Sequence, residues 1–235
     1  MSEAPQLIAL SQLLLAFLPV LAVVFILFRW TGEGPDTVYG LGRMLFQLLL
    51  IGYFLSFLFE VNNAPTVLIV LSVMVLISSW IALRTVKQQR RAHYGLAALS
   101  ILIGGGLSLL VVSQLVLQIE PYYSTRHLIP LAGMVFASAM NSVSIAAERF
   151  FSETKQGMAY GPARSVALKA ALIPITNSLF AVGLVSLPGM MTGQILTGVD
   201  PLIAARYQIM VMCMLFSSAG LAAALFLRLL KSKQE

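Results

Sequence analysis

Long uninterrupted apolar segments dominate this 235-residue sequence and limit what it can fold into. Several exceed the roughly 18–20 residues that a helix needs to cross a ~30 Å hydrocarbon core. Charged residues make up only 10% of the chain, whereas soluble domains carry about 25%. Barrel strands alternate in polarity over about 10 residues, and these segments do not. We therefore predict an all-α polytopic membrane protein, with residues 1–235 forming a single transmembrane domain in the lipid bilayer.

Seven segments have the length and apolarity of a membrane span, and all 15 Lys and Arg except Arg126 and Arg206 lie in or beside alternate connections between them. Cytoplasmic connections carry the excess of Lys and Arg in membrane proteins. The pattern predicts about seven transmembrane helices with an outside N-terminus and a cytoplasmic C-terminus. The expected spans are 7–28, 38–59, 65–83, 95–118, 128–147, 166–187 and 202–230.

Polar side chains within these spans are candidates for a substrate path, because polar groups are costly in lipid and usually face the bundle interior. Gln47 lies in the second span, four residues after Arg43. The presence of Arg43 in the span is explained if its side chain snorkels toward the membrane surface. Asn177 lies in the sixth span, within one turn of Pro174. Because proline removes a helix hydrogen bond, we expect a bend there, which occurs in transporters and in passive bundles alike.

The fifth span carries Asn141 on the same helix face as Gly133 and Ala137. This smooth face with one amide is typical of a tight helix interface, and a path lined by Asn141 is the alternative. Ser138, Ser142 and Ser144 add hydroxyls that can bond back to their own helix. In the fourth span, the run Gly104–Gly106 predicts close helix packing.

The last span begins with Asp200 and Pro201, residue types typical of an N-cap and a first helical position. Met210, Met212, Cys213 and Met214 suggest a soft-metal site. However, residues 210, 212 and 214 spread around a helix and do not converge on one ion, so we interpret these methionines as core packing.

Residues 182–201, VGLVSLPGMMTGQILTGVDP, interrupt the apolar pattern just before the last span. They are too short to cross the membrane and too apolar for an ordinary solvated loop. We predict a short re-entrant or interfacial helix, about Met190–Leu196, that forms an outer gate with Pro188, Gly189, Gly193 and Gly198 as hinges. Met190, Met191 and Gln194 would line the path, with metal binding by the two methionines as the lesser hypothesis.

Motifs for chemistry on this chain are missing from the sequence. It has no GxxxxGK[ST] phosphate loop and no Ser–His, Asp–Asp or HExxH arrangement. We therefore expect neither enzyme activity nor a resident cofactor. The net charge of +6 follows the membrane-orientation pattern, so we expect no nucleic-acid partner.

Three stretches resemble the FetB-type permease family, the membrane subunit of an iron-exporting ABC transporter with plant relatives linked to aluminium tolerance. They are GRMLFQLLLIGYFL (42–55), IPLAGMVFASAMNSVSI (129–145) and KAALIPITNSLFAVGLVSLPGMMTGQILTGVDPLIAARYQIMV (169–211). The resemblance implies a homodimeric permease in the cell (inner or plasma) membrane. It also implies a separate cytoplasmic ATPase subunit that binds ATP and drives export of iron, another metal or a small solute.

The sequence departs from the family pattern in the connection ERFFSETKQGMAYGPARS (148–165), which is shorter than in family members and lacks their L-x-LGA turn. The residues expected to keep the contact with the ATPase are Glu148, Arg149, Glu153 and Lys155. The alternative to a permease is a seven-helix membrane sensor or scaffold without transport activity, which the span count also allows.

Overall fold

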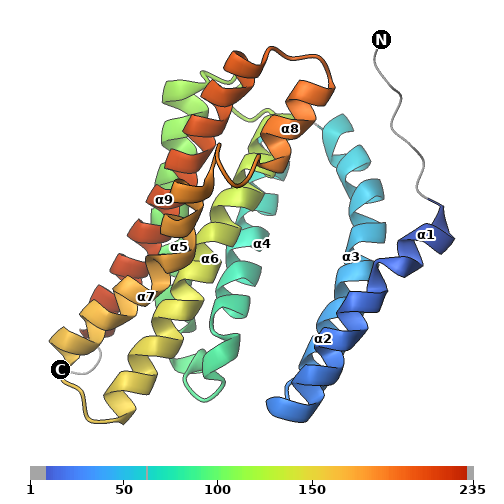
Figure 1. Ribbon diagram of the computed structural model, residues 1–235. Helices are drawn as coiled ribbons and strands as arrows, with labels where there is room; N and C mark the ends of the chain where they lie inside the picture. Colours follow the sequence, from blue (N-terminus) through green and yellow to red (C-terminus); the bar gives the residue numbers. More distant parts are fainter. Residues whose placement is uncertain (1–8, 62, 232–235) are drawn as a thin grey trace. The chain divides into compact units, whose positions relative to one another are not determined.

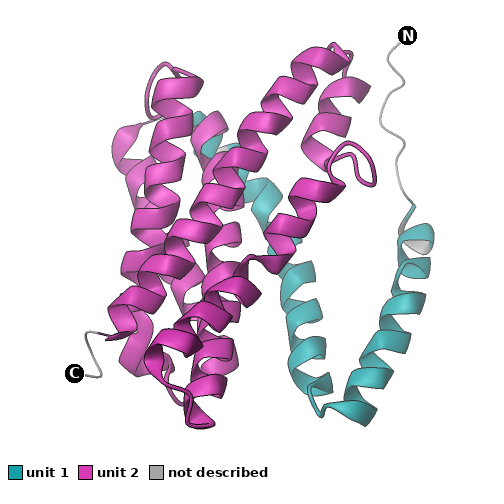
Figure 2. Cartoon of the chain, turned by 60° about the vertical axis from the view of Figure 1, so that its left-hand side comes forward, with its two compact units in different colours: residues 1–61 teal, residues 62–235 magenta. Residues whose placement is uncertain are grey.

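The computed structural model describes residues 9–61 and 63–231, and helices make up most of them (Figure 1). The chain separates into two compact units, residues 1–61 and 62–235 (Figure 2). Each unit is described by itself. That both act within a single transmembrane domain stays a prediction.

Unit 1 contains a helical hairpin. Helices α1 (Leu10–Leu15) and α2 (Phe17–Trp30) lead into a tight turn, and α3 (Gly34–Glu60) packs against α2. Gly32 has φ +71°, a conformation that glycine adopts readily, and its N–H donates to the Leu27 carbonyl at 3.0 Å. The ring of Phe28 lies over Gly34, where a Cβ atom would not fit. These two glycines therefore allow the close turn of the hairpin.

Unit 2 is a helical bundle in which long helices α4, α5, α6 and α9 pack together with α7 and the short α8 (Figure 1). Its elements are α4 (Ala64–Ala82), the 3₁₀ turn η1 (Arg84–Val86), α5 (Arg90–Leu110), the π-helix η2 (Val111–Val116), α6 (Thr125–Lys155), α7 (Tyr160–Ala181), α8 (Gly189–Leu196) and α9 (Pro201–Lys231).

Small residues form the centre of unit 2, where α5, α6 and α9 meet. A Cβ atom on Gly104 would lie 2.5 Å from the Ala222 nitrogen of α9, and one on Gly105 would lie 2.8 Å from the Phe136 ring of α6. Helices in lipid associate through such close backbone approaches. The packing predicted for this glycine run is confirmed at both positions, whereas Gly106 has open space around it.

Six helical segments in the described part of the chain are long and apolar enough to cross a membrane, one fewer than the sequence count. They are Gln12–Trp30, Gly34–Glu60, Ala64–Ala82, Arg90–Val116, Thr125–Lys155 and Pro201–Lys231. The polytopic, all-helical class is confirmed. The orientation depends on the number of crossings and stays a prediction.

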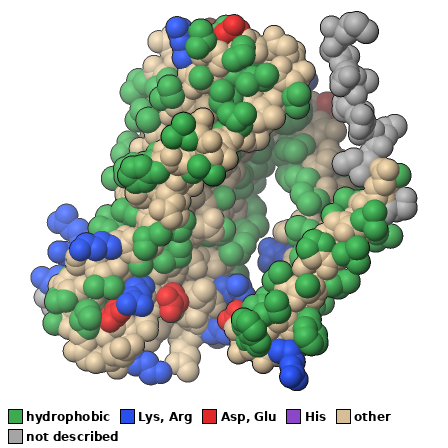
Figure 3. All heavy atoms as spheres, in the orientation of Figure 1, with side chains coloured by type: hydrophobic (Ala, Val, Ile, Leu, Met, Phe, Trp, Pro, Cys, Tyr) green, Lys and Arg blue, Asp and Glu red, His purple; other side chains and the backbone are tan. Residues whose placement is uncertain are grey.

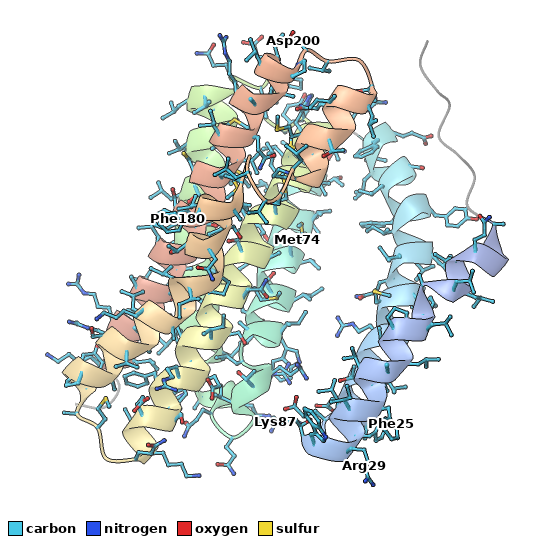
Figure 4. All side chains as sticks on the ribbon, in the orientation of Figure 1. Phe25, Arg29, Met74, Lys87, Phe180 and Asp200 are labelled. Carbon is cyan, nitrogen blue, oxygen red and sulfur yellow. The ribbon has the colours of Figure 1, made fainter. Side chains whose placement is uncertain are left out.

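The segment that does not qualify is the sixth expected span, 166–187. There α7 ends at Ala181, and the chain turns through Gly183, which has φ +84°. Lys169 and Asn177 lower the apolarity of α7 itself. Figure 4 places Phe180, near the end of α7, well short of the end of the bundle marked by Asp200. The expected span 166–187 therefore consists of the later part of α7 and the turn after it, and the short helix α8 begins two residues beyond it.

Candidate functional site

Basic side chains gather at one end of unit 2, which we call the basic end. It comprises the α4–α5 connection, the α6–α7 turn and the last turns of α9, and Figure 3 shows Lys and Arg clustered there at the lower left. Lys87 marks this end and Asp200 the opposite, far end (Figure 4). Its cationic residues are Arg84, Lys87, Arg90, Arg91, Arg149, Lys155, Arg164, Arg228 and Lys231.

Arg90 fixes the α4–α5 connection at the basic end. Its Nε and Nη2 atoms donate to the Trp80 carbonyl at 3.0 and 2.6 Å. The guanidinium carbon also lies 3.6 Å from the centroid of the Trp80 ring, a cation–π geometry. Tyr94, one turn further along α5, donates its hydroxyl to the Leu76 carbonyl at 3.1 Å. These contacts hold the start of α5 against the end of α4 and so fix the connection between the two helices.

A groove of about 790 Å³ lies between this connection and the end of α6, and we call it the basic-end groove. Of the four residues predicted to couple to an ATPase, Glu148 and Lys155 line it. The groove therefore carries both charge signs on a partly apolar floor. Its lining residues are Thr85, Val86, Lys87, Gln88, Gln89, His93, Glu148, Phe151, Ser152, Thr154 and Lys155.

The other two predicted coupling residues form an ion pair with each other. Arg149 Nη2 lies 2.5 Å from Glu153 Oε1, with 9% of the Glu153 side chain exposed and 47% of that of Arg149. A carboxylate so deeply buried needs its partner, because an uncompensated charge in a low-dielectric site is costly. The pair stabilises the end of α6, and Arg149 alone offers an exposed face to a partner.

Aromatic side chains connect the basic-end groove to the other helices. His93 of α5 stacks near Phe151 with ring centroids 5.2 Å apart, and Phe151 contacts Phe150. Phe150 in turn meets the Tyr160 ring of α7 edge-on at 5.8 Å. The Tyr160 hydroxyl then donates to the Leu227 carbonyl of α9 at 2.8 Å. Direct contacts therefore connect the groove to four helices, α5, α6, α7 and α9.

At the far end, the break between α7 and α9 contains the short helix that the sequence predicts. Helix α8 spans Gly189–Leu196, close to the expected Met190–Leu196, and it packs against α9. Pro188 occupies its N-cap position. Gly198 has φ +92° and donates its N–H to the Ile195 carbonyl at 2.9 Å. The predicted boundaries of this helix are confirmed, and its role as a gate stays a prediction.

Asp200 caps the last helix. Its Oδ1 atom accepts hydrogen bonds from the N–H groups of Leu202 and Ile203 at 2.8 and 3.3 Å, and α9 begins at Pro201. This is the capping geometry that the sequence predicts, and it satisfies two backbone donors that a helix start leaves open.

The six residues predicted to line a path lie on four different helices. Gln47 is exposed on α3 of unit 1, while Asn141 on α6 and Asn177 on α7 are exposed on unit 2. Met190, Met191 and Gln194 lie together on α8. Their role in a path stays a prediction.

The expected role of Asn141 as the polar contact of a helix interface is wrong within unit 2, because its side chain is exposed there. Its neighbours make the contacts instead. Ser138 donates to the Leu215 carbonyl of α9 at 3.1 Å, and Ser142 donates to the Ala171 carbonyl of α7 at 3.3 Å. These two hydroxyls therefore bond to neighbouring helices rather than back to their own, since the neighbouring backbones come close enough to accept.

Two glutamines each have a buried amide oxygen for which the described residues provide no hydrogen-bond partner. They are Gln194 of α8 and Gln208, two turns into α9, which is only 5% exposed. Each such group costs free energy unless something binds it. Sequence reasoning did not single out Gln208, although an amide within an apolar span is the signal that would have found it.

The described residues contain no group of three or more His, Cys, Asp or Glu side chains that could hold a metal ion. The fold and these sites define a class, namely a multi-pass membrane protein with a structured basic end and an irregular far end. The family described as "Uncharacterised protein family (UPF0014)" matches residues 10–234. The chain belongs to this family of membrane proteins.

Similar proteins come from bacteria and plants. The chain is 36% identical to the "UPF0014 membrane protein slr1647" of Synechocystis, with 83% of this chain and 82% of the relative covered. It is 34% identical to the "Probable iron export permease protein FetB" of Escherichia coli, with 80% and 76% covered. It is 30% identical to "Protein ALUMINUM SENSITIVE 3" of Arabidopsis thaliana, with 80% and 73% covered. No solved structure matched the chain in the same comparison.

Proposed function

We propose that this chain is the permease subunit of an ABC-type exporter in the cell membrane. It moves iron, or another metal or small solute, out of the cytoplasm, and a separate chain hydrolyses the ATP. The observation that carries the proposal is the basic-end groove with the aromatic contacts behind it. The Escherichia coli relative, whose name describes a probable iron export permease, supports the proposal. The suggestion that the substrate is iron rests on that name alone.

The basic-end groove has the properties of a docking site for a cytoplasmic ATPase subunit. The groove is lined by two positive side chains, Lys87 and Lys155, and one negative side chain, Glu148. Charges of both signs favour one orientation of a charged partner. The buried Arg149–Glu153 pair and the Arg90–Trp80 contact keep its walls in place. A segment of the ATPase seated there would push on α6 and on the α4–α5 connection together.

The contacts between Phe150, Tyr160 and the Leu227 carbonyl would carry that displacement to α7 and α9. These two helices flank the break that holds α8. Discontinuous helices commonly surround the binding site of transporters, because their irregular backbone lines a cavity. The proposed action is therefore that ATP hydrolysis at the basic end moves α8 at the far end.

The amide oxygens of Gln194 and Gln208 are the proposed polar contacts of the path near α8. The exposed apolar side chains of the preceding turn fit a lipid-facing or subunit-facing surface, with Leu184 and Val185 being 90% and 85% exposed. A homodimer that encloses the path between two copies would cover this surface. The sensor alternative drew on a count of seven spans, and the six candidate spans do not favour it.

Charge reversal in the basic-end groove tests the docking site. Affinity-tagged chain is purified after co-expression with a candidate ATP-binding subunit from the same organism, and the amount of that subunit retained is measured. The double variant Glu148→Lys, Lys155→Glu should lose most of it. Arg206→Glu, at the far end, is the matched control and should retain it. Equal retention by both variants would place the docking site elsewhere, and no retention by the unaltered chain would argue against the permease itself.

A further inference from the structure

A second cavity, of about 440 Å³, lies between α5 with η2 and the middle of α9, and we call it the sulfur cavity. Met210, Cys213 and Met214 all line it from α9. Residues three and four positions apart share a helix face, with Cβ atoms roughly 5–6 Å apart. The sequence pattern first suggested Met210, Met212 and Met214, which diverge. The set that faces one cavity in the structure contains Cys213 and leaves out Met212.

The three side chains lead from the hydrophobic core to the surface of unit 2. Met214 is 2% exposed and anchors one side, whereas Met210 is half-buried and Cys213 is exposed toward the outside of unit 2. Met212 points away and does not line the cavity. The thiol therefore lies at the exposed edge of the cavity, and both thioethers lie further in on the same helix face. Methionine has three rotatable bonds, so both sulfurs can adjust toward one ion.

The remaining polar groups of the cavity leave the sulfurs as its principal ligands. The Ser108 hydroxyl donates to the Gly104 carbonyl at 2.9 Å, and the Ser217 hydroxyl donates to the Cys213 carbonyl at 2.6 Å. Both hydroxyl protons are thus engaged, and only weakly basic oxygens face the space. No Asp, Glu or His lines the cavity. A hard cation would find neither a carboxylate nor an imidazole there.

Charge balance narrows the class of ion. A metal ion displaces the thiol proton of Cys213 and binds the thiolate, so the site contributes one negative charge. A monovalent ion then gives a neutral complex, whereas a divalent ion would leave a net positive charge in apolar surroundings, which is costly. Thiolate and thioether ligands select soft ions such as Cu(I). The π-helix η2 supplies Val111, Val112 and Val116 to the opposite wall, and π-helical segments often occur at functional sites.

We propose that Met210, Cys213 and Met214 form a binding site for a soft monovalent metal ion, Cu(I) or its analogue Ag(I). The site goes beyond the proposed function, because it requires neither an ATPase nor transport. If the chain does export metal, the site names a substrate class, a thiophilic monovalent ion, that differs from iron.

Competition with the chromophoric chelator bicinchoninate tests the site in the purified full-length chain under anaerobic, reducing conditions. The unaltered chain should withdraw one equivalent of Cu(I) from the chelator. Cys213→Ser should abolish this withdrawal, and Met210→Leu and Met214→Leu should each weaken binding by about tenfold or more. Met212→Leu, on the other face of the same helix, should bind as the unaltered chain does. Size-exclusion elution and helical circular dichroism establish that each variant is folded.

Two results would overturn the proposal. If the Met210→Leu, Met214→Leu double variant bound Cu(I) as tightly as the unaltered chain, an isolated thiol would account for the binding. If an equal concentration of Fe(II) displaced Cu(I), the site would have no preference for soft ions. Because the measurement uses the chain without its ATPase, these results are separate from the success or failure of ATP-dependent export.

Discussion

Gly104 of α5 lies directly against the backbone of Ala222 of α9, so that a Cβ atom on Gly104 would be 2.5 Å from the Ala222 nitrogen. Neither backbone can yield locally, because both positions lie in the centre of long helices. Glycine at this position therefore sets how closely the two helices approach, and the close approach stabilises the bundle.

Gly104→Ala should destabilise unit 2 by about 1–3 kcal/mol, the usual cost of adding a methyl group to a close-packed core. Thermal unfolding of the detergent-solubilised protein measures it. Gly106→Ala is the matched control, because the nearest atom to its Cβ is the flexible Leu102 Cδ1 at 4.0 Å. The control should melt at or above the temperature of the unaltered protein. Equal melting temperatures of the Gly104→Ala and Gly106→Ala variants would contradict the close α5–α9 contact.

Tyr160→Phe should reduce export more than it reduces stability. It removes the 2.8 Å hydrogen bond to the Leu227 carbonyl and leaves the ring contact with Phe150 in place. A hydrogen bond of this kind contributes about 1 kcal/mol to stability. ATP hydrolysis by the bound partner should continue while transport per ATP falls. The two rates are measured together in vesicles, and an unchanged ratio would remove Tyr160 from the proposed pathway.

Gly198→Ala should disturb the end of α8, since φ +92° is a conformation that costs a residue with a Cβ atom roughly 1–2 kcal/mol. Gly193 has open space around it and lies within the helix, so Gly193→Ala should be tolerated. Gly189→Leu and Gly193→Leu meet no atom of the described chain, yet we expect both to impair export if α8 is a gate. Normal membrane insertion with normal export from both leucine variants would exclude the gate.

Gln208→Leu should raise the melting temperature and lower transport. The substitution removes a buried amide whose oxygen has no partner, and relieving such a group gains about 1–3 kcal/mol. Gln114→Leu is the control, because the Gln114 amide donates to the Ser113 hydroxyl and the Tyr122 carbonyl, and its loss should lower stability. A Gln208→Leu protein that melts earlier would mean that the oxygen has a partner in the membrane-embedded protein.

Local sequence signals predicted the parts of this fold that depend on local structure. Six of the seven long apolar segments correspond to helices that could span a membrane, namely those that contain α2, α3, α4, α5, α6 and α9, since length and hydropathy suffice to form a helix in lipid. The 190–196 segment and the Asp200 cap were found from glycine, proline and aspartate at helix boundaries. Such features depend on a few neighbouring residues and do not require knowledge of which helices pack together.

Contacts between helices were harder to predict because they depend on the rotation of each helix about its axis. Asn141 seemed the polar contact of α6, but the close approach of α9 and α7 turns Ser138 and Ser142 toward their carbonyls instead. The rotation of α9 likewise buries Gln208 and turns the face that carries Met210, Cys213 and Met214 toward a cavity. A periodic pattern gives the residues of one face but not the neighbour that the face meets.

The central claim, that this chain is the permease of an ATP-driven metal exporter, is tested most directly by transport in inverted membrane vesicles. Vesicles containing the chain and its ATP-binding subunit should accumulate radioactive iron when ATP is added, while vesicles with a subunit unable to hydrolyse ATP should not. Parallel vesicles supplied with other metals in the external buffer identify the preferred ion. The account predicts ATP-dependent accumulation of at least one metal that requires both chains. Equal accumulation of every metal with and without this chain would contradict it.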